Sequence, residues 1–213
     1  QAQFHPVKYL LALAEDVKNS DSYIFENTEA VDIADGEPCT VTTRTGKKVT
    51  ASKVIIASHF PFFDGGGLYF ARMYAEKSYI IGLKAKDRFP EGMFITAEDP
   101  GRSLRSQNCD NGELILIAGE HHRTGENENT NIHYQNLISF AKDTFQVEDI
   151  IYRWSTQDCM TMDGVPYIGN LTSRSPNLYV ATGFGKWGIS NGTVAGMLLT
   201  DLITKGERPR APL

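Results

Sequence analysis

The sequence predicts a chain of mixed class, with α/β organisation at its two ends and an α+β unit in the middle. Two short apolar runs, residues 53–58 and 177–182, are typical of strands buried on both faces of a parallel sheet. The segments between them are mostly β-prone pieces separated by turn residues, which favours an antiparallel sheet. We therefore expect parallel-sheet organisation at residues 1–67 and again at 159–213, and an antiparallel sheet with flanking helices at 68–158.

The first third of the chain begins with an amphipathic helix. Apolar residues recur at helical spacing over 6–17, and Pro6 stands at a tolerated first-turn position. Asp35-Gly36 and Thr45-Gly46 are turn signals, so the pieces between them predict a small antiparallel meander. Its expected strands are 23–25, 30–33, 40–43 and 49–50. The continuous apolar run 53–58 is then expected to be a central strand.

The middle of the chain predicts the antiparallel sheet and one helix. Its expected strands are 76–83, 92–96, 103–105, 113–118 and 150–154. Apolar spacing predicts a helix of about three turns over 134–145. Two polar stretches, 119–131 and 156–166, are expected to be loops.

Composition excludes several classes of protein. Of the 213 residues, 41% are hydrophobic, yet no apolar run approaches the ~18 residues of a membrane span. The 21 basic and 26 acidic residues are scattered, so neither nucleic acid nor a membrane is an expected partner. Cys39, Cys109 and Cys159 have no paired spacing for zinc or an iron–sulfur cluster, which predicts no metal site and a reducing, cytoplasmic setting.

The most informative segment follows the apolar strand 177–182. Residues 183–188 are a glycine-rich turn, and an apolar helix through Ile203 opens directly after it. Such a turn lets the backbone approach a ligand, and the helix N-terminus favours an anionic or electron-rich group. The alternative is a tight connection that needs glycine only for its backbone dihedrals. The pattern alone leaves both readings open.

Several stretches together resemble one family. They are His5-Pro6 with its helix, Thr28-Glu29-Ala30-Val31, the run from Gly46 to Ser58, Asp163-Gly164-Val165-Pro166-Tyr167-Ile168-Gly169, and the run from Asn177 to Phe184. In order and spacing, these stretches resemble the FAD-dependent D-amino-acid oxidase superfamily, in its glycine-oxidase and sarcosine-oxidase-like branch. The resemblance implies that residues 1–67 and 159–213 are the middle and C-terminal parts of a Rossmann-like FAD domain, and that 68–158 are an antiparallel-sheet substrate domain.

The resemblance also implies which residues hold FAD. They are Ala30, Val31, Ala57, Ser58, Asp163, Gly164, Gly183, Phe184, Gly185, Lys186, Trp187, Gly188 and Ile189. Among them, Lys186 is expected to act in catalysis, because its cation and the neighbouring amides would stabilise negative charge on the reduced flavin. Trp187, inside the glycine turn, is a better ligand candidate than Trp154.

The chain departs from the family at the phosphate-binding unit. In the family, an amino-terminal strand–turn–helix with the sequence G-x-G-x-x-G binds the FAD pyrophosphate. We expect no such sequence here, and Gly65-Gly66-Gly67 is no substitute because a β-prone stretch follows it. The chain is therefore expected to be a fragment that holds no FAD on its own.

A second departure concerns the substrate. The family's amino-acid oxidases clamp the substrate carboxylate with an arginine shortly before the Asp-Gly-x-Pro segment. Asp158 stands at that position here, and an acid there would repel a carboxylate. Asp158 is therefore a candidate substrate-binding residue. Arg105, the second candidate, or Arg102 or Lys186 could supply a cation from another direction, although the favoured interpretation of the two arginines is an exposed strand face.

A possible neighbouring domain is also implied. Residues 155–169 and 183–191 resemble a subgroup in which a Rieske iron–sulfur domain follows the oxidoreductase. The Arg208-Pro209-Arg210-Ala211-Pro212 tail is typical of a linker to such a domain.

Two other features favour structural over chemical interpretations. Adjacent His121 and His122 are expected in a surface turn and not at a metal, because no ligand stands at suitable spacing. Cys159 lies near a stretch where some members anchor flavin covalently, but a buried thiol fits it better.

The expected function is that of a fragment of an FAD-dependent oxidoreductase. The parent protein would oxidise a small amine or related C–H donor by hydride transfer to flavin. Its expected partners are that substrate and the rest of the parent chain, including an N-terminal dinucleotide-binding segment. The alternative is a non-catalytic binding or interaction domain on the same scaffold.

Overall fold

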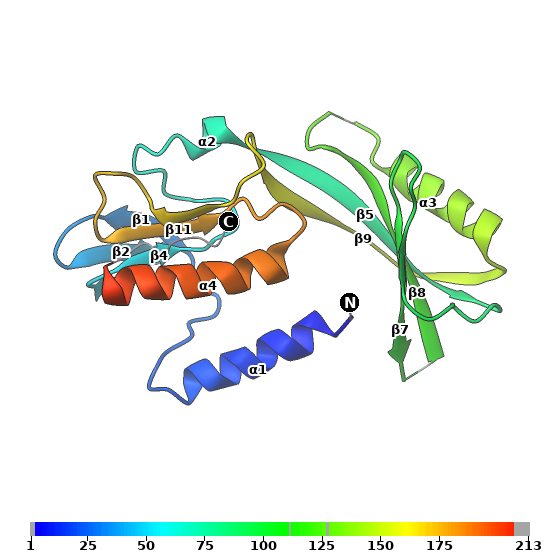
Figure 1. Ribbon diagram of the computed structural model, residues 1–213, viewed down its shortest axis with the longest axis horizontal. Coiled ribbons are helices and arrows are strands. Elements are labelled where there is room, and N and C mark those ends of the chain that lie inside the picture. The colour runs from blue at the N-terminus through cyan, green and yellow to red at the C-terminus, as the bar shows by residue number, and fades with distance from the viewer. Residues whose placement is uncertain (1–2, 111, 127, 207–213) are drawn as a thin grey trace.

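The structure is a computed structural model that describes residues 3–110, 112–126 and 128–206. The chain forms two lobes joined by two long strands (Figure 1). The predicted mixture of α/β and α+β organisation is confirmed, since one lobe contains parallel strands and the other an antiparallel sheet with a helix on it. The predicted linker at 208–212 lies outside the described residues.

The first lobe is built around a three-stranded sheet. Its order is β10 (Tyr167–Asn170), β11 (Leu178–Thr182) and β4 (Val54–Ile56), with β11 parallel to β4 and antiparallel to β10. All five residues of β11 are buried, as the apolar run predicts. The sequence predicts β4 as a central strand, but it lies at the edge of this sheet. One side of β4 pairs with β11, and no described residue pairs with the other side, so the prediction is wrong for the described residues.

Two further layers cover this sheet. On one face, Tyr179 and Ala181 pack against Ala195 and Leu199 of the long helix α4 (Gly188–Lys205). The other face packs against the meander of β1 (Ala30–Ala34), β2 (Cys39–Thr43) and β3 (Lys48–Ala51) through a shared core. Three of the four predicted meander strands are therefore confirmed.

The fourth predicted meander strand, 23–25, is wrong. Residues 22–25 have no regular structure, and Tyr23 and Phe25 are exposed. Asp21 and Asn27 flank the segment with φ of 54° and 52°, left-handed values that interrupt an extended chain. The β-prone side chains of this segment pack against no buried surface, so their propensity does not produce a strand.

The second lobe is a five-stranded antiparallel sheet with one helix on it. The strand order is β6 (Met93–Ile95), β7 (Ser103–Cys109), β8 (Gly112–Arg123), β5 (Met73–Ala85) and β9 (Val147–Thr161). Helix α3 (Asn131–Thr144) covers one face and buries Leu137, Ile138 and Ala141. Burying one such leucine contributes roughly 1.5–3 kcal/mol.

Two predicted loops of this lobe begin too early. β8 continues through residues 119–123, and β9 continues to Thr161, because β5 pairs with β9 along its whole length. Backbone amides and carbonyls in a sheet need hydrogen-bond partners whatever the side chains of their residues are. Polar residues can therefore belong to these strands. The bulge at Glu120, with φ of 54°, interrupts the pairing of β8 with β5.

Helix α1 (Pro6–Lys18) confirms the first predicted helix, and none of its residues is buried. A short helix that the sequence did not predict, α2 (Tyr69–Arg72), leads into β5. The carboxylate of Asp64 starts it by accepting hydrogen bonds from the amides of Leu68 and Tyr69, at 3.0 and 2.7 Å. None of the described helices has the length and apolar character needed to cross a bilayer.

Candidate functional site

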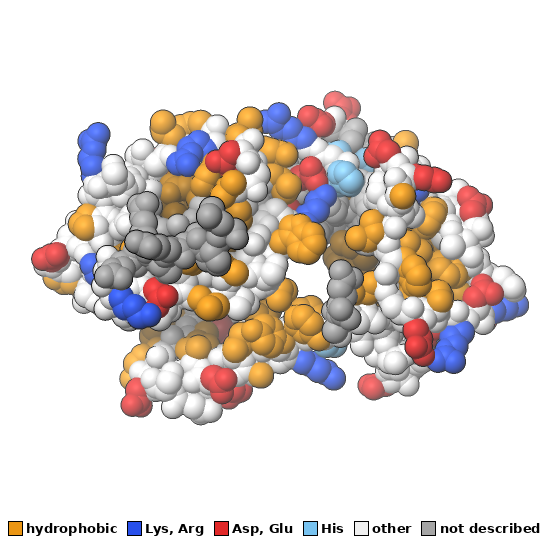
Figure 2. Space-filling model, in the orientation of Figure 1, with side chains coloured by type: hydrophobic (Ala, Val, Ile, Leu, Met, Phe, Trp, Pro, Cys, Tyr) orange, Lys and Arg blue, Asp and Glu red, His pale blue; other side chains and the backbone are white. Residues whose placement is uncertain are grey.

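The carboxyl ends of the parallel strands β4 and β11 meet at one edge of the first sheet. Residues 57–59 follow β4 and residues 183–187 follow β11, and the hydroxyl of Thr182 donates a hydrogen bond to the carbonyl of His59. In open α/β sheets, ligands bind outside the carboxyl ends of the strands. We call this region, together with the end of β9 that packs on it, the junction. Figure 2 shows a hollow between the lobes, bordered largely by hydrophobic side chains.

Residues 183–187 form a glycine turn that lies against the end of β9. Gly183 and Gly185 have φ of 72° and 49°, values that favour glycine. The amide of Gly185 donates to the carbonyl of Cys159 at 3.3 Å. A Cβ on Gly183 would overlap the methyl group of Thr161, so this close approach also requires glycine. Part of the turn is therefore explained by packing alone.

The turn and the first residue of α4 read Gly183-Phe184-Gly185-Lys186-Trp187-Gly188, which matches G-x-G-x-x-G between a strand and a helix. The prediction that the chain contains no such sequence is therefore wrong. The turn still differs from a phosphate-binding one. The amides of Gly185 and Trp187 donate to carbonyl oxygens of the protein, and no strand follows α4 among the described residues.

The first turn of α4 offers donors to a ligand. Trp187 precedes the helix, and no side chain caps its N-terminal amides. These amides lack intrahelical partners and lie at the positive end of the helix dipole. The side-chain amide of Asn191 donates to the carbonyl of Phe184 at 3.0 Å and holds the turn in place. The Trp187 side chain is exposed and open to a planar ligand.

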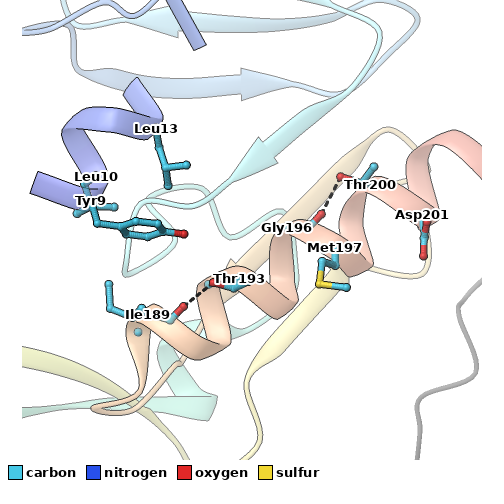
Figure 3. A pocket seen from close by; sticks show the side chains of 11 residues that line it. Tyr9, Leu10, Leu13, Ile189, Thr193, Gly196, Met197, Thr200 and Asp201 are labelled. Carbon is cyan, nitrogen blue, oxygen red and sulfur yellow. Dashed lines mark hydrogen bonds between the residues drawn. The ribbon is translucent and has the colours of Figure 1, made fainter. Parts of the chain in front are cut away.

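A cavity of about 710 Å³ lies between α1 and α4 (Figure 3). Its apolar walls come from both helices: Tyr9, Leu10, Leu13, Ile189 and Met197. A Cβ at Gly188 or Gly196 would meet no atom within 4 Å, so α4 presents open glycine surface to this space. The uncapped amides, the open glycines and the exposed indole fit the ring end of FAD, an aromatic group with carbonyl acceptors.

A row of charged side chains faces the glycine turn from the second lobe. Glu76 of β5 stands in register with Arg123 of β8 and with Asp158 of β9. Residues directly opposite in antiparallel strands point to the same face, with Cβ atoms about 4.5–5.5 Å apart. The Lys186 ammonium of the glycine turn forms an ion pair with the Glu76 carboxylate. The Arg123 guanidinium lies 5.4 Å from the centre of the Tyr74 ring.

The structure does not bring the other predicted cation, Arg105, to this row. Arg105 lies across β8 from Gly82, which is six residues along β5 from Glu76, or about 20 Å. Arg102 is also engaged elsewhere, in an ion pair of 2.7 Å with the buried Glu120. Among the three cations considered from the sequence, only Lys186 reaches the junction.

The predicted cofactor residues of the first third separate into two places. Ala57 and Ser58 directly follow β4 at the junction, and the Ser58 hydroxyl donates to the carbonyl of Phe60 at 2.8 Å. Ala30 and Val31 begin β1 in the meander. They share no described contact with the glycine turn.

Asp163 and Gly164 lie in the turn between β9 and β10, next to the glycine turn. Strand β10 pairs its first residue, Tyr167, with Thr182, which brings the two turns to the same sheet edge. The amide of Val165 donates to the Asp163 carboxylate and lowers the pKa of that acid. These predicted residues therefore belong to the junction.

The prediction of a surface turn at His121-His122 is wrong, whereas that of a buried thiol at Cys159 is confirmed. His121 and His122 lie in β8, so the predicted surface turn is wrong; His122 Nε2 lies 3.0 Å from the Tyr79 hydroxyl. Cys159 is buried in the core of the first lobe, and burial raises the pKa of its thiol. The described residues contain no group of His, Cys, Asp or Glu side chains that could hold a metal ion.

Three junction residues were missed in the sequence. Glu76 and Arg123 join the row only through strand register, which local spacing does not show. His59 directly follows the predicted strand 53–58, so its place at a strand end was a usable signal. Its Nε2 donates to the carbonyl of Gln157 at 2.9 Å and links the first lobe to β9.

Known proteins resemble this chain over nearly all of its length. The family DAO, FAD dependent oxidoreductase, matches residues 1–202. The putative Rieske 2Fe-2S iron-sulfur protein YhfW of Bacillus subtilis (strain 168) is 44% identical over 209 residues, covering 98% of this chain and 41% of that protein. The probable oxidoreductase OrdL of Haemophilus influenzae is 24% identical, covering 93% of this chain and 47% of that protein.

A solved structure shows the same fold. Glycine oxidase from Geobacillus kaustophilus has a TM-score of 0.75 at 23% identity, covering 93% of this chain and 54% of that one. The chain thus spans about half, or less, of the length of each of these relatives.

Proposed function

This chain belongs to the FAD dependent oxidoreductase family, and from that membership we propose that it is part of a longer enzyme that oxidises an amine. In this proposal, the first lobe contributes the ring-binding part of an FAD domain, and the second lobe contributes the substrate sheet. The domain boundaries are those expected from the sequence, with 1–67 and 159–213 on the flavin side and 68–158 on the substrate side.

One observation carries the proposal. The glycine turn, at the carboxyl end of a parallel strand, meets a row of charged side chains on a second sheet. A ring held at the turn would therefore face groups able to orient a small polar substrate. Hydride transfer needs donor and acceptor to be held together, and this arrangement would hold them so.

In the proposed enzyme, some residues of this chain would contact the flavin ring and others would bind the substrate. Bound FAD supplies the acceptor for a hydride equivalent from a C–H next to nitrogen. The amides of Gly188 and Ile189 at the start of α4 would stabilise negative charge on the ring. The Lys186 ammonium, whose charge is balanced by Glu76, would donate a hydrogen bond to a ring carbonyl. Asp158 would attract a protonated amine and repel a carboxylate. Packing of Trp187 on the ring would help to exclude water.

The relatives suggest what else the longer protein contains. YhfW is described as a Rieske iron–sulfur protein, and 59% of its length lies outside the match, since 41% is covered. We propose that a Rieske domain belongs to the same protein as this chain and that an additional segment binds the FAD pyrophosphate. Three unpaired cysteines fit a reducing compartment, and we place the protein in the cytoplasm.

The absorbance spectrum of the full-length protein, purified from cells, tests the cofactor. Stoichiometric flavin that is reduced by amines under anaerobic conditions is the expected result. A full-length protein without flavin would refute the proposal and support a non-catalytic binding or interaction domain on this scaffold. Flavin that is present but inert to a broad panel of amines would refute the substrate class.

Asp158→Arg tests the substrate charge. We expect the rate of flavin reduction by glycine, sarcosine or a D-amino acid, relative to simple amines, to rise by about tenfold or more, because attraction replaces repulsion at close range. Asp149→Arg, an exposed change farther along β9, is the matched control and should leave the ratio unchanged. Wild-type protein that is reduced fastest by amino acids would contradict the assignment and point to Lys186 or Arg123 as a carboxylate clamp.

A further inference from the structure

The ion pair between Lys186 and Glu76 connects the two lobes. Lys186 belongs to the glycine turn of the first lobe, and Glu76 lies on β5 of the second. The Glu76 side chain is 17% exposed and that of Lys186 is 40% exposed, so the carboxylate is the more enclosed partner. No motif in the sequence links these residues, which are 110 positions apart.

The pair matters because Lys186 is the cation of the glycine turn. Arg123 stands in the same row, but its guanidinium lies over the Tyr74 ring. Any anion that approached Lys186 would meet an ammonium already neutralised by Glu76. A neutral carbonyl oxygen can still accept a hydrogen bond from such an ammonium, since it has three donors.

Displacing Glu76 would carry an additional cost. Asp158 stands directly opposite Glu76 on the same face of the sheet. Without Lys186, the two carboxylates would face each other at a distance where like charges destabilise a strand pair. Asp158 therefore strengthens the preference of Glu76 for Lys186.

We propose that Glu76 is a specificity-determining residue: an internal carboxylate that occupies Lys186 and so excludes substrate carboxylates from the junction. This inference rests on the proposed function and deepens it, because it names amines without a carboxylate as the substrate class. Glu76 acts through Lys186, so its role is positional. Removing it should create a carboxylate site, whereas a merely structural role would not.

Calorimetric titration of the full-length protein with acetate tests the proposal without relying on turnover. In Glu76→Gln, which keeps the size of the side chain but not its charge, acetate should bind about tenfold more tightly than in wild type. The double variant Glu76→Gln/Lys186→Met should lose that gain. No gain in Glu76→Gln, or a gain that persists without Lys186, would overturn the proposal.

Asp158→Asn is the matched control, because it removes one negative charge from the same row but leaves Glu76 on Lys186. Its acetate affinity should rise less than that of Glu76→Gln. Equal tightening in both variants would mean that net charge governs binding and would overturn the proposal. If Glu76→Gln does not fold by circular dichroism, Glu76→Thr, a residue suited to a strand, carries the same test.

The flavin content of each preparation separates this inference from the proposed function. A full-length protein without flavin refutes the proposed function, while the acetate titration still decides the role of Glu76. With flavin present, Glu76→Gln should also gain reduction by glycine or sarcosine relative to amines. Loss of the acetate effect in a flavin-containing protein would refute the inference alone.

Discussion

At the scale of single residues, the junction depends on backbone conformations that side chains disfavour. Gly185 has φ of 49°, and a Cβ there would lie 3.5 Å from the Cε of Met160. The added atom would therefore fit sterically, and the cost comes from the backbone, at roughly 1–2 kcal/mol in the left-handed region. Gly183 differs, because Thr161 leaves no room for any Cβ.

Gly185→Val in the full-length protein should lower flavin retention by about tenfold or more, because a branched side chain would tilt the turn away from the ring. Gly66→Val is a matched control: Gly66 also has a positive φ, 83°, and open space around it, but lies in the turn before α2. Both substitutions strain the backbone to a similar degree, so a difference in flavin content should come only from the place of each residue relative to the flavin site. Equal flavin content per folded protein in the two variants would contradict the placement of the site.

At the scale of elements, the bulge in β8 places an ionised group between the sheet and α3. The Glu120 carboxylate accepts hydrogen bonds from Arg102 at 2.7 Å and from Asn136 of α3 at 2.8 Å, and His133 Nδ1 lies 3.6 Å away. Only 6% of the Glu120 side chain is exposed. Burial by itself raises the pKa of Glu120, but the bonds from Asn136 and Arg102 hold it below its ordinary value.

A carboxyl group with a lowered pKa in the folded state stabilises the fold above its ordinary pKa. That contribution is lost as the pH falls from about 4.5 through the folded pKa. In Glu120→Gln, we therefore expect this part of the acid-induced loss of stability to disappear. At neutral pH the variant should be less stable by about 3 kcal/mol, since Arg102 loses its buried partner.

Urea denaturation from pH 3 to pH 7, analysed for the free energy of unfolding at each pH, measures both effects. Glu148→Gln, at an exposed position of β9, is the control and should keep the wild-type slope. An unchanged pH dependence in Glu120→Gln would show that other groups govern acid unfolding.

At the scale of the whole molecule, the junction exists only because two lobes meet. The long strands β5 and β9 run from the second lobe to the glycine turn and α2 (Figure 1). The Gly185–Cys159 backbone bond, the His59–Gln157 bond and the Lys186–Glu76 pair all link the first lobe to these two strands. A shift between the lobes would therefore separate the glycine turn from the row of charged side chains.

The isolated chain is expected to purify without stoichiometric FAD. The first turn of α4 offers amides to the ring end, but the amides of Gly185 and Trp187 in the glycine turn donate to carbonyl oxygens of the protein and are not free for the pyrophosphate. Phosphate contacts through charge-assisted hydrogen bonds, at ~1.5–3 kcal/mol each, would then be missing. The ratio of flavin to protein absorbance after purification measures the outcome, and yellow protein with one FAD per chain would refute the expectation.

The sequence by itself determined the elements whose buried faces follow from a local pattern of apolar residues. The run 177–182 became the fully buried β11, the apolar spacing of the last segment became α4, and the glycines between them became a turn at a sheet edge. These features were predictable because helix and strand periods and glycine dihedrals act within a few residues. The family resemblance rested in part on the same segments.

Only the tertiary structure decided which distant residues share a face. Glu76, Arg123 and Asp158 form one row because β8, β5 and β9 pair in one register, and register depends on how buried faces match across strands. The same pairing extended β8 and β9 through segments whose polar side chains predicted loops. Strand pairing gives backbone amides and carbonyls their hydrogen-bond partners and does not depend on which side chains stand nearby in the sequence. The partner of Lys186 could therefore not be predicted from any spacing in the chain.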